Sequence, residues 1–93
     1  MRTIERSTAF KRDSKREARG RHGAALYAAL LPVLLALAND DPLEPRHRDH
    51  ELSGDWQGYR ECHVKPDLLL IYRKTDAETV RLARLGSHSE LFG

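Results

Sequence analysis

Three histidines and one aspartate in the C-terminal half of the chain are the residues best suited to chemistry. His50, His63 and His88 are separated by short segments with strand-like patterns, and Asp67 follows His63 in a turn. Histidine exchanges protons near neutral pH, and titratable groups on separate short elements can meet in space. These residue types therefore predict a site that transfers protons between acids and bases.

The composition indicates a small protein with an uneven charge distribution. The 93 residues carry a formal net charge of +2, and a chain of this length forms one domain with a modest core. Residues 1–22 contain eight Lys or Arg against three Asp or Glu, whereas residues 23–56 contain two against six. A basic segment can mark a nucleic-acid contact, although a helix with a solvated charged face gives the same pattern.

Two features bear on cellular location. Because Cys62 is the single cysteine, an internal disulfide and a zinc site made of cysteines are excluded. A lone cysteine is consistent with a protein of the reducing cytoplasm, and we expect it to be a small apolar residue within a strand. The apolar segment 23–38 follows a basic stretch, as in a signal peptide. Unlike a signal peptide, however, the basic stretch also contains acidic residues. The apolar segment itself is interrupted by Pro32 and is shorter than the roughly 18 residues of a membrane span. We expect a buried helix of a cytoplasmic protein without membrane contacts.

The N-terminal half is predicted to be mainly helical. We expect a short edge strand over residues 2–7, and the charged segment 8–19 favours a helix that Gly20 ends. The segment 24–38 is apolar on nearly all sides, which is typical of a buried helix. Pro32 should kink this helix or end one helical piece, and Asn39 is a candidate C-terminal cap.

The C-terminal half is predicted to form a sheet after a loop over residues 40–49. The expected strands cover residues 55–64, 68–74 and 79–85, with turns at 65–67 and 76–78. Short turns imply an antiparallel meander, because parallel strands need long crossovers. The prediction is thus an α+β fold in one domain, residues 1–93, with two N-terminal helices (about residues 8–39) packed on a small antiparallel sheet (about residues 55–88).

The sequence of the C-terminal half carries a family resemblance. It matches the pattern D-H-x-L-x-G-x-W-x-G-x-R-x-x-H-x-x-P-D-x-x-L-I-Y followed by R-x-G-[ST]-H-x-x-L-F. The matching residues are Asp49, His50, Leu52, Gly54, Trp56, Gly58, Arg60, His63, Pro66, Asp67, Leu70, Ile71, Tyr72, Arg84, Gly86, Ser87, His88, Leu91 and Phe92. This pattern resembles the YafQ toxins of the RelE/ParE superfamily, which belong to bacterial toxin–antitoxin systems. The match covers about half of the chain.

The resemblance implies a ribosome-dependent endoribonuclease that cuts messenger RNA in the decoding site. Cleavage without a metal or cofactor uses the 2′-hydroxyl as nucleophile and needs a base, an acid and a cation at the phosphate. The functional set in such toxins corresponds to His50, His63, Asp67 and His88, with Phe92 contributing.

We expect His88 and Asp67 to be the acid–base pair, although the sequence does not decide which is the acid and which the base. We expect His50 and His63 to contact or protonate the scissile phosphate. Arg84 is the candidate for charge stabilisation, and Phe92 could stack on a base.

Each of these residues also has a structural interpretation. His50 could close a loop, His63 could be a turn histidine bonded to a carboxylate, and His88 could cap a turn. Phe92 could belong to the core, and Arg84 could pair with an acidic side chain. Trp56 and Tyr72 are expected to pack. Two positions depart from close relatives, since Glu61 stands where Asp is frequent and Leu68 where some relatives have tryptophan.

The resemblance also implies partners. A cognate antitoxin, in this family usually a ribbon-helix-helix protein, would mask the nuclease. The ribosome would be contacted through ribosomal RNA phosphates by basic residues of the first helix. These candidate RNA contacts are Lys11, Arg12, Lys15, Arg16 and Arg19.

Two other functions are compatible with the sequence. A non-enzymatic toxin of the ParE type would bind DNA gyrase, although the histidine set argues against a pure binder. A small metalloprotein would use the H-x-x-H spacing of His47 and His50, because neutral imidazole is a common zinc ligand.

Overall fold

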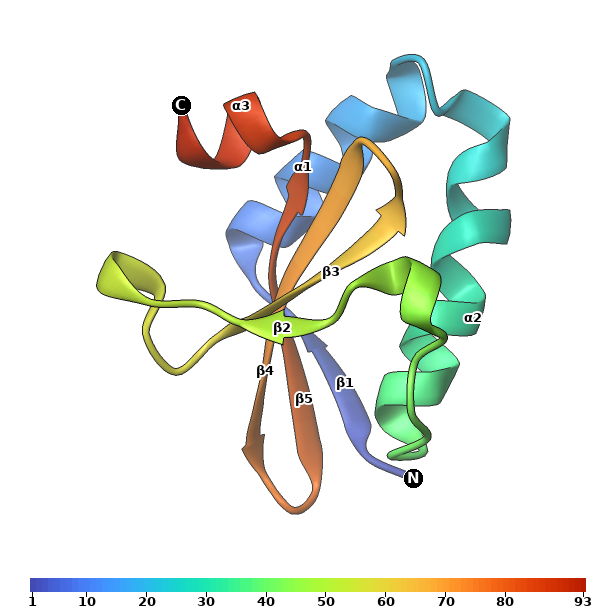
Figure 1. The fold of residues 1–93 in the computed structure, drawn as a ribbon. Helices are drawn as coiled ribbons and strands as arrows, with labels where there is room; N and C mark the ends of the chain where they lie inside the picture. Colours follow the sequence, from blue (N-terminus) through green and yellow to red (C-terminus); the bar gives the residue numbers. More distant parts are fainter.

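The computed structural model describes every residue from Met1 to Gly93 and contains a five-stranded mixed sheet with three α-helices (Figure 1). The elements in chain order are β1 Thr3–Arg6, α1 Thr8–Arg19, a 3-10 turn Gly23–Ala25, α2 Leu26–Ala38, a 3-10 turn Pro45–His47, β2 His50–Glu51, a 3-10 turn Gly54–Trp56, β3 Arg60–Lys65, β4 Leu68–Asp76, β5 Thr79–Gly86 and α3 His88–Phe92.

The sheet has the strand order β1-β5-β4-β3-β2. Strands β3, β4 and β5 form the predicted antiparallel meander, and β2 pairs antiparallel with β3 at one edge. At the other edge β1 runs parallel to β5, from Thr3 opposite Thr79 to Arg6 opposite Leu82. The sheet is therefore mixed rather than purely antiparallel, because most of the chain separates β1 from β5 and provides the crossover that parallel strands need.

Helix α1 has the predicted boundaries. The Ser7 hydroxyl accepts a hydrogen bond from the Phe10 amide at 2.9 Å, which caps the first turn, and Gly20 follows the last. Helix α2 continues through Pro32 to Ala38, with Asn39 as its C-terminal cap, so no helical piece ends at Pro32. None of the helices combines the length and the hydrophobicity that crossing a lipid bilayer requires.

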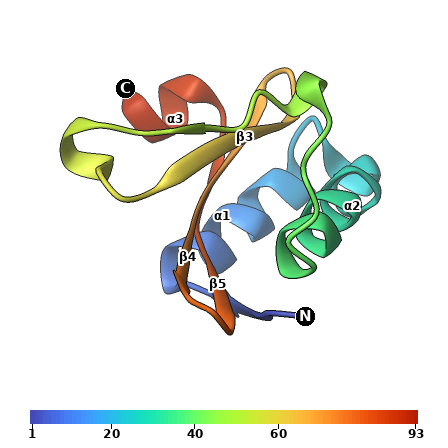
Figure 2. The same ribbon diagram turned by 60° about the horizontal axis from the view of Figure 1, so that its bottom comes forward.

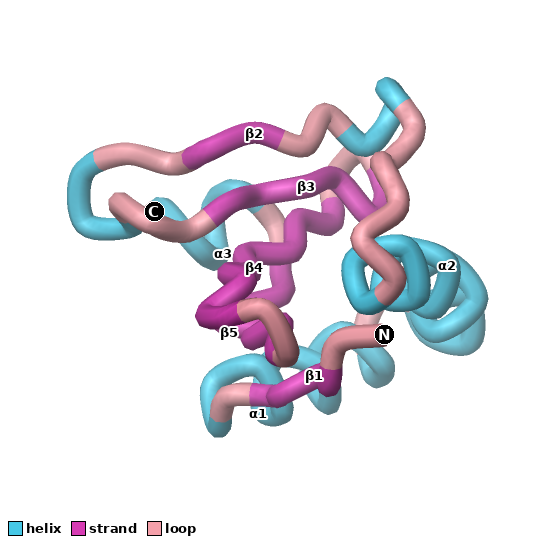
Figure 3. The backbone as a smooth tube through the Cα atoms, turned by 90° about the horizontal axis from the view of Figure 1, so that it is seen from below, coloured by secondary structure: helices cyan, strands magenta, loops and turns pink.

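Apolar residues cover both faces of the sheet. On one face, α1 and α2 pack through residues such as Phe10 and Leu30 on Leu70 of β4. On the other face, Leu91 of α3 packs with Leu69 and with partly buried aromatic residues of the segment 52–59. Figure 2 shows α1 and α2 near one side of β4 and β5, and Figure 3 shows the sheet from below with β1 beside α1. The continuous apolar run in β4 is explained by this two-sided burial.

The C-terminal half departs from the prediction at one strand boundary and in one additional helix. The strand expected over residues 55–64 begins only at Arg60, because the preceding segment forms a 3-10 turn and a bend in which Gly58 has a φ of 93°. Helix α3 was not predicted. Its signal was present, since Ser87 and Glu90 form a capping box around His88, the first residue of the helix.

Candidate active site

A polar pocket lies where β3, the β3–β4 turn and the start of α3 meet. Its lining includes Glu61, His63, Asp67 and His88. Three of these residues were predicted from the sequence, and the turn at Pro66 and Asp67 brings the end of β3 towards the start of β4. The fold therefore gathers acid and base groups from separate elements at one place.

The buried carboxylate of Glu61 lies between two of the histidines. Its Oε1 atom is 3.7 Å from Nε2 of His50 and 3.8 Å from Nε2 of His63. Pairing of β2 with β3 sets this arrangement, because His50 stands opposite Glu61 in the register. Glu61 is only 6% exposed. Glu61 was singled out from the sequence only as a variable position. Its two-residue spacing from His63 in a strand places both side chains on one face, whereas its contact with His50 depends on the pairing of β2 with β3.

Backbone carbonyls orient both of these imidazole rings. Nδ1 of His50 is 2.7 Å from the Arg48 carbonyl, and Nδ1 of His63 is 3.3 Å from the Pro66 carbonyl. A carbonyl oxygen can only accept, so each Nδ1 donates the hydrogen. Each Nε2 is thereby left to face Glu61 or a ligand, and a proton on it would be available to a phosphate oxygen.

Asp67 is held by two residues that the sequence analysis did not select. Its Oδ2 atom lies 2.8 Å from Nη1 of Arg21, and its Oδ1 atom lies 3.6 Å from Nε2 of His22. Arg21 is largely exposed, whereas His22 is buried. Both come from the segment that joins α1 to α2, so a basic charge stands beside the carboxylate. Arg21 and His22 are distant from Asp67 in the chain, so no local pattern predicted this contact.

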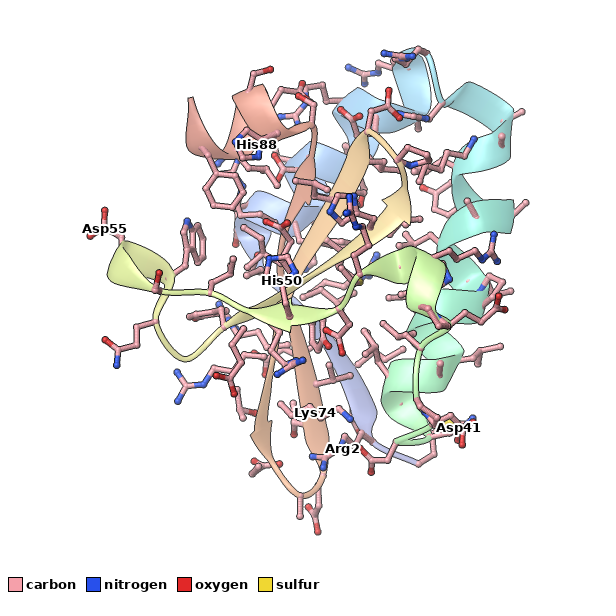
Figure 4. All side chains as sticks on the ribbon, in the orientation of Figure 1. Arg2, Asp41, His50, Asp55, Lys74 and His88 are labelled. Atoms are coloured by element: carbon pink, nitrogen blue, oxygen red, sulfur yellow. The ribbon has the colours of Figure 1, made fainter.

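His88 and Phe92 occupy one turn of α3. Their ring centroids are 5.1 Å apart with an interplanar angle of 40°, and Phe92 is 38% exposed. Leu91 between them is buried and anchors the helix. Phe92 is thus not a core residue, and its ring lies beside the His88 ring. Figure 4 labels His88 on α3 and His50 on β2, and His50 does not line the pocket itself.

The structure places Arg84 apart from this group. Its guanidinium forms two hydrogen bonds with Asp13 of α1, at 2.7 and 3.2 Å. Asp13 is 1% exposed and also accepts from the Leu85 amide at 3.0 Å. Burial alone raises the pKa of Asp13, but the bonds from Arg84 and Leu85 outweigh it and hold the pKa below its usual value. Arg84 therefore forms a structural ion pair through Nε and Nη2, and it does not line the pocket where the phosphate contact was expected, so that contact stays a prediction.

The basic residues of α1 divide into two groups. The exposed and unpaired residues are Lys11, Arg12, Lys15 and Arg19. Arg16 differs, because its guanidinium binds Asp13, Glu17 and Glu90. The four free cations remain available for contacts with nucleic acid, whereas Arg16 joins elements of this chain.

The pair His47 and His50 does not form a chelate. His47 is buried, and its Nδ1 donates to the His63 carbonyl at 2.6 Å, whereas His50 is directed towards Glu61. No group of three or more His, Cys, Asp or Glu side chains has a metal-binding arrangement. The H-x-x-H spacing therefore reflects a short turn that packs His47 under β3.

A second pocket lies on the β2–β3 hairpin. Its lining includes Tyr59, Arg60 and Arg73, and Arg73 lies 5.6 Å from the centroid of the Tyr59 ring. It contains none of the histidines, and Arg60 is paired with Asp49 at 3.2 Å. Its lining also includes Glu51 and Lys74 but no imidazole, so the predicted histidines point to the pocket that contains Glu61 and His88 as the candidate site.

Comparison with known proteins gives matches over the whole chain. The family model described as "Bacterial toxin of type II toxin-antitoxin system, YafQ" matches residues 2–93. The Escherichia coli protein named mRNA interferase toxin YafQ is 42% identical over 93 residues, which are 100% of this chain and 98% of that protein. A chain of the E. coli DinJ–YafQ complex superposes with a TM-score of 0.83 at 40% identity, covering 100% of both chains. A metal-bound toxin from Helicobacter pylori superposes with a TM-score of 0.88 at 45% identity, covering 99% of this chain and 100% of that one.

Proposed function

This chain belongs to the YafQ family of bacterial toxins from type II toxin–antitoxin systems, and on that premise we propose that it is an endoribonuclease that cuts messenger RNA in the cytoplasm. The E. coli relative is named an mRNA interferase. The observation that carries the proposal is the shared pocket of Glu61, His63, Asp67 and His88. It supplies an acid, a base and phosphate contacts within one site, as RNA cleavage requires.

We assign the base to Asp67 and the acid to His88. Asp67 takes the proton of the 2′-hydroxyl while that oxygen forms its bond to phosphorus. His88 donates a proton to the 5′-oxygen as the bond between phosphorus and this oxygen breaks. The products are a 2′,3′-cyclic phosphate and a free 5′-hydroxyl. Asp67 suits the base because its ion pair with Arg21, at 2.8 Å, is made by the carboxylate form.

The histidines on β2 and β3 are proposed to bind the scissile phosphate. Their Nε2 atoms converge on Glu61, so in the protonated form both rings can donate towards the same phosphate oxygens. Glu61 would keep this cationic pair in place when no RNA is bound. Phe92, which is exposed beside His88, is positioned to stack on a base of the substrate.

We propose that the ribosome presents the message and that no metal or other cofactor takes part. The exposed cations of α1, which are Lys11, Arg12, Lys15 and Arg19, provide contacts for ribosomal RNA phosphates. The pocket contains carboxylates and imidazoles that can act as acid and base, and a protonated imidazole would supply positive charge at the phosphate. The metal-bound H. pylori toxin makes metal dependence a question for direct measurement.

The test is inducible expression of the wild type and of an Asp67→Ala/His88→Ala variant, with mapping of the 5′ ends of a reporter mRNA. We expect new ends at codon-periodic positions with the wild type only, and none in a reporter whose start codon is removed. Growth arrest without new mRNA ends, or arrest by both proteins alike, would reject the nuclease and point to a binding toxin such as one that targets gyrase.

We also propose that the antitoxin, of ribbon-helix-helix type, covers an apolar row on α2. Tyr27, Leu31 and Leu35 follow one another at four-residue spacing and are 62%, 57% and 44% exposed. Such a row on a helix without charged residues suits the apolar face of a partner helix. The E. coli relative forms the DinJ–YafQ complex.

Charge substitutions on this row test the antitoxin contact. Leu31→Asp should weaken co-purification with the cognate antitoxin by at least about tenfold, because it places a carboxylate in an apolar contact. Thr75→Asp, which adds the same group to the exposed β4–β5 hairpin, is the control. Undiminished binding by Leu31→Asp would place the antitoxin on another face.

A further inference from the structure

Arg16 connects three separate elements behind the active site. Its Nη2 donates to the Leu85 carbonyl of β5 at 2.9 Å, and its Nη1 donates to Asp13 of α1 at 3.0 Å. Its Nε lies 3.1 Å from Glu17 and 3.0 Å from Oε2 of Glu90 in α3. One guanidinium therefore joins α1, β5 and α3.

Glu90 links this guanidinium to His88. The Oε1 atom of Glu90 accepts from the Ser87 amide at 2.8 Å, while the Ser87 hydroxyl accepts from the Glu90 amide at 3.2 Å. The two carboxylate oxygens thus have different partners, one at the cap of α3 and one at Arg16. His88 directly follows Ser87 and is the first residue of a helix of five residues. So short a helix cannot fix its own direction, which must come from its cap and its packing.

Because Gly86 has no side chain, there is space beside β5 for the ion pair of Arg16 and Glu90. A Cβ atom at position 86 would lie 2.8 Å from Nη2 of Arg16 and 3.2 Å from Oε1 of Glu90. Any larger residue at position 86 would push the ion pair of Arg16 and Glu90 away from β5. The glycine is therefore required for this ion pair to form where it does.

We propose that Arg16 is a positioning residue, which acts through Glu90 on the cap of α3 and so sets the direction of His88 towards Asp67. This inference rests on the proposed role of His88 in RNA cleavage. It differs from the expectation that Arg16 contacts RNA phosphate, because its donors are engaged within the chain. The two interpretations give opposite predictions for the loss of the Glu90 charge.

The kinetic test compares Arg16→Gln, Glu90→Gln and the double variant on translating ribosomes. Glutamine at position 90 still accepts from the Ser87 amide, so only the ion pair is lost. We expect each single variant to cut about tenfold more slowly at saturating substrate, within the roughly 100-fold that a misplacement of 1 Å costs. KM should stay within about twofold, and the double variant should be no slower than Arg16→Gln, because Arg16→Gln already removes the contact with Glu90.

Direct RNA contact by Arg16 would give a different result. Glu90→Gln would then remove a negative charge near the RNA and leave the rate unchanged or higher, and Arg16→Gln would raise KM. Either result overturns the inference. The matched control is Arg81→Gln, since Arg81 is 39% exposed against 40% for Arg16 and pairs with Glu5 between β5 and β1. Cleavage by this variant should equal that of the wild type.

A second measurement does not depend on cleavage. The NMR signal of the His88 ring and the hydrogen-exchange rate of the Leu91 amide should both change in Arg16→Gln and in Glu90→Gln. Both quantities should be unchanged in Arg81→Gln. A wild-type protein that cuts no RNA would refute the proposed function, and the His88 signal would still decide whether Arg16 sets the position of α3. An unchanged His88 signal in both variants would refute the inference even if the enzyme is active.

Discussion

The buried carboxylate of Asp13 offers the sharpest test of the energetics of this fold. Asp13 accepts four hydrogen bonds, two from Arg84, one from Arg16 and one from the Leu85 amide, all within 3.2 Å. In Asp13→Asn one oxygen becomes an NH₂ group that faces donors. The two arginines are 27% and 40% exposed and regain water. Asp13→Asn should therefore lower the free energy of unfolding by about 3 kcal/mol, which is the lower end of the range for breaking a buried ion pair.

The assay is urea unfolding followed by circular dichroism, with Asp41→Asn, an exposed carboxylate, as the control. A loss of about 3 kcal/mol corresponds to a fall in Tm of roughly 12–24 °C for a chain of this size. Because the pKa of Asp13 is lowered in the folded state, its contribution is fully present above the usual carboxyl pKa. It disappears as the pH falls through the folded-state value, where the wild-type residue becomes neutral like asparagine.

The difference between wild type and Asp13→Asn should accordingly be constant above about pH 5 and shrink in acid. A difference below about 1 kcal/mol at neutral pH would refute the reasoning, because it would mean that solvent or a rearranged Arg84 replaces all four contacts. A difference that does not shrink in acid would show that the charge of Asp13 is not the stabilising feature.

Three further predictions concern the pocket and the core. Glu61→Gln should slow cleavage by roughly 10- to 100-fold with little change in stability, because the two imidazoles lose their shared anion. Single-turnover kinetics measure the cleavage rate and urea unfolding measures the stability, and an unchanged rate would mean that Glu61 does not belong to the site. The cleavage rate in EDTA should equal the rate without it, in a matched control in which the ribosomes keep their magnesium. A loss of cleavage in EDTA that zinc or copper restores would contradict the metal-free mechanism. Burial raises the pKa of the Cys62 thiol to about 12, so iodoacetamide at about pH 8 should label only the unfolded protein; rapid labelling of the native protein would show that β3 opens.

The sequence alone determined most of the local structure. The boundaries of α1 followed from helix-forming residues between Ser7 and Gly20, and the turns at residues 65–67 and 76–78 predicted the meander of β3, β4 and β5. These signals are short-range, since caps, glycines and apolar runs act within a few residues of chain. The motif also drew attention to His63, Asp67 and His88, which line one pocket in the structure.

The tertiary structure decided which partner each charged residue has. Glu61 lies between His50 and His63 only because β2 pairs with β3, and Asp67 meets Arg21 only because the α1–α2 connection folds over the turn. Arg84, expected at the phosphate, is instead bound to Asp13. Glu61 and His63 share a face because they are two residues apart on one strand, but the other partners are distant in the chain and no periodicity relates them. Their pairing follows from how the helices pack on the sheet, and buried charges must find a partner there because leaving them unpaired costs several kcal/mol, on the order of 3–5.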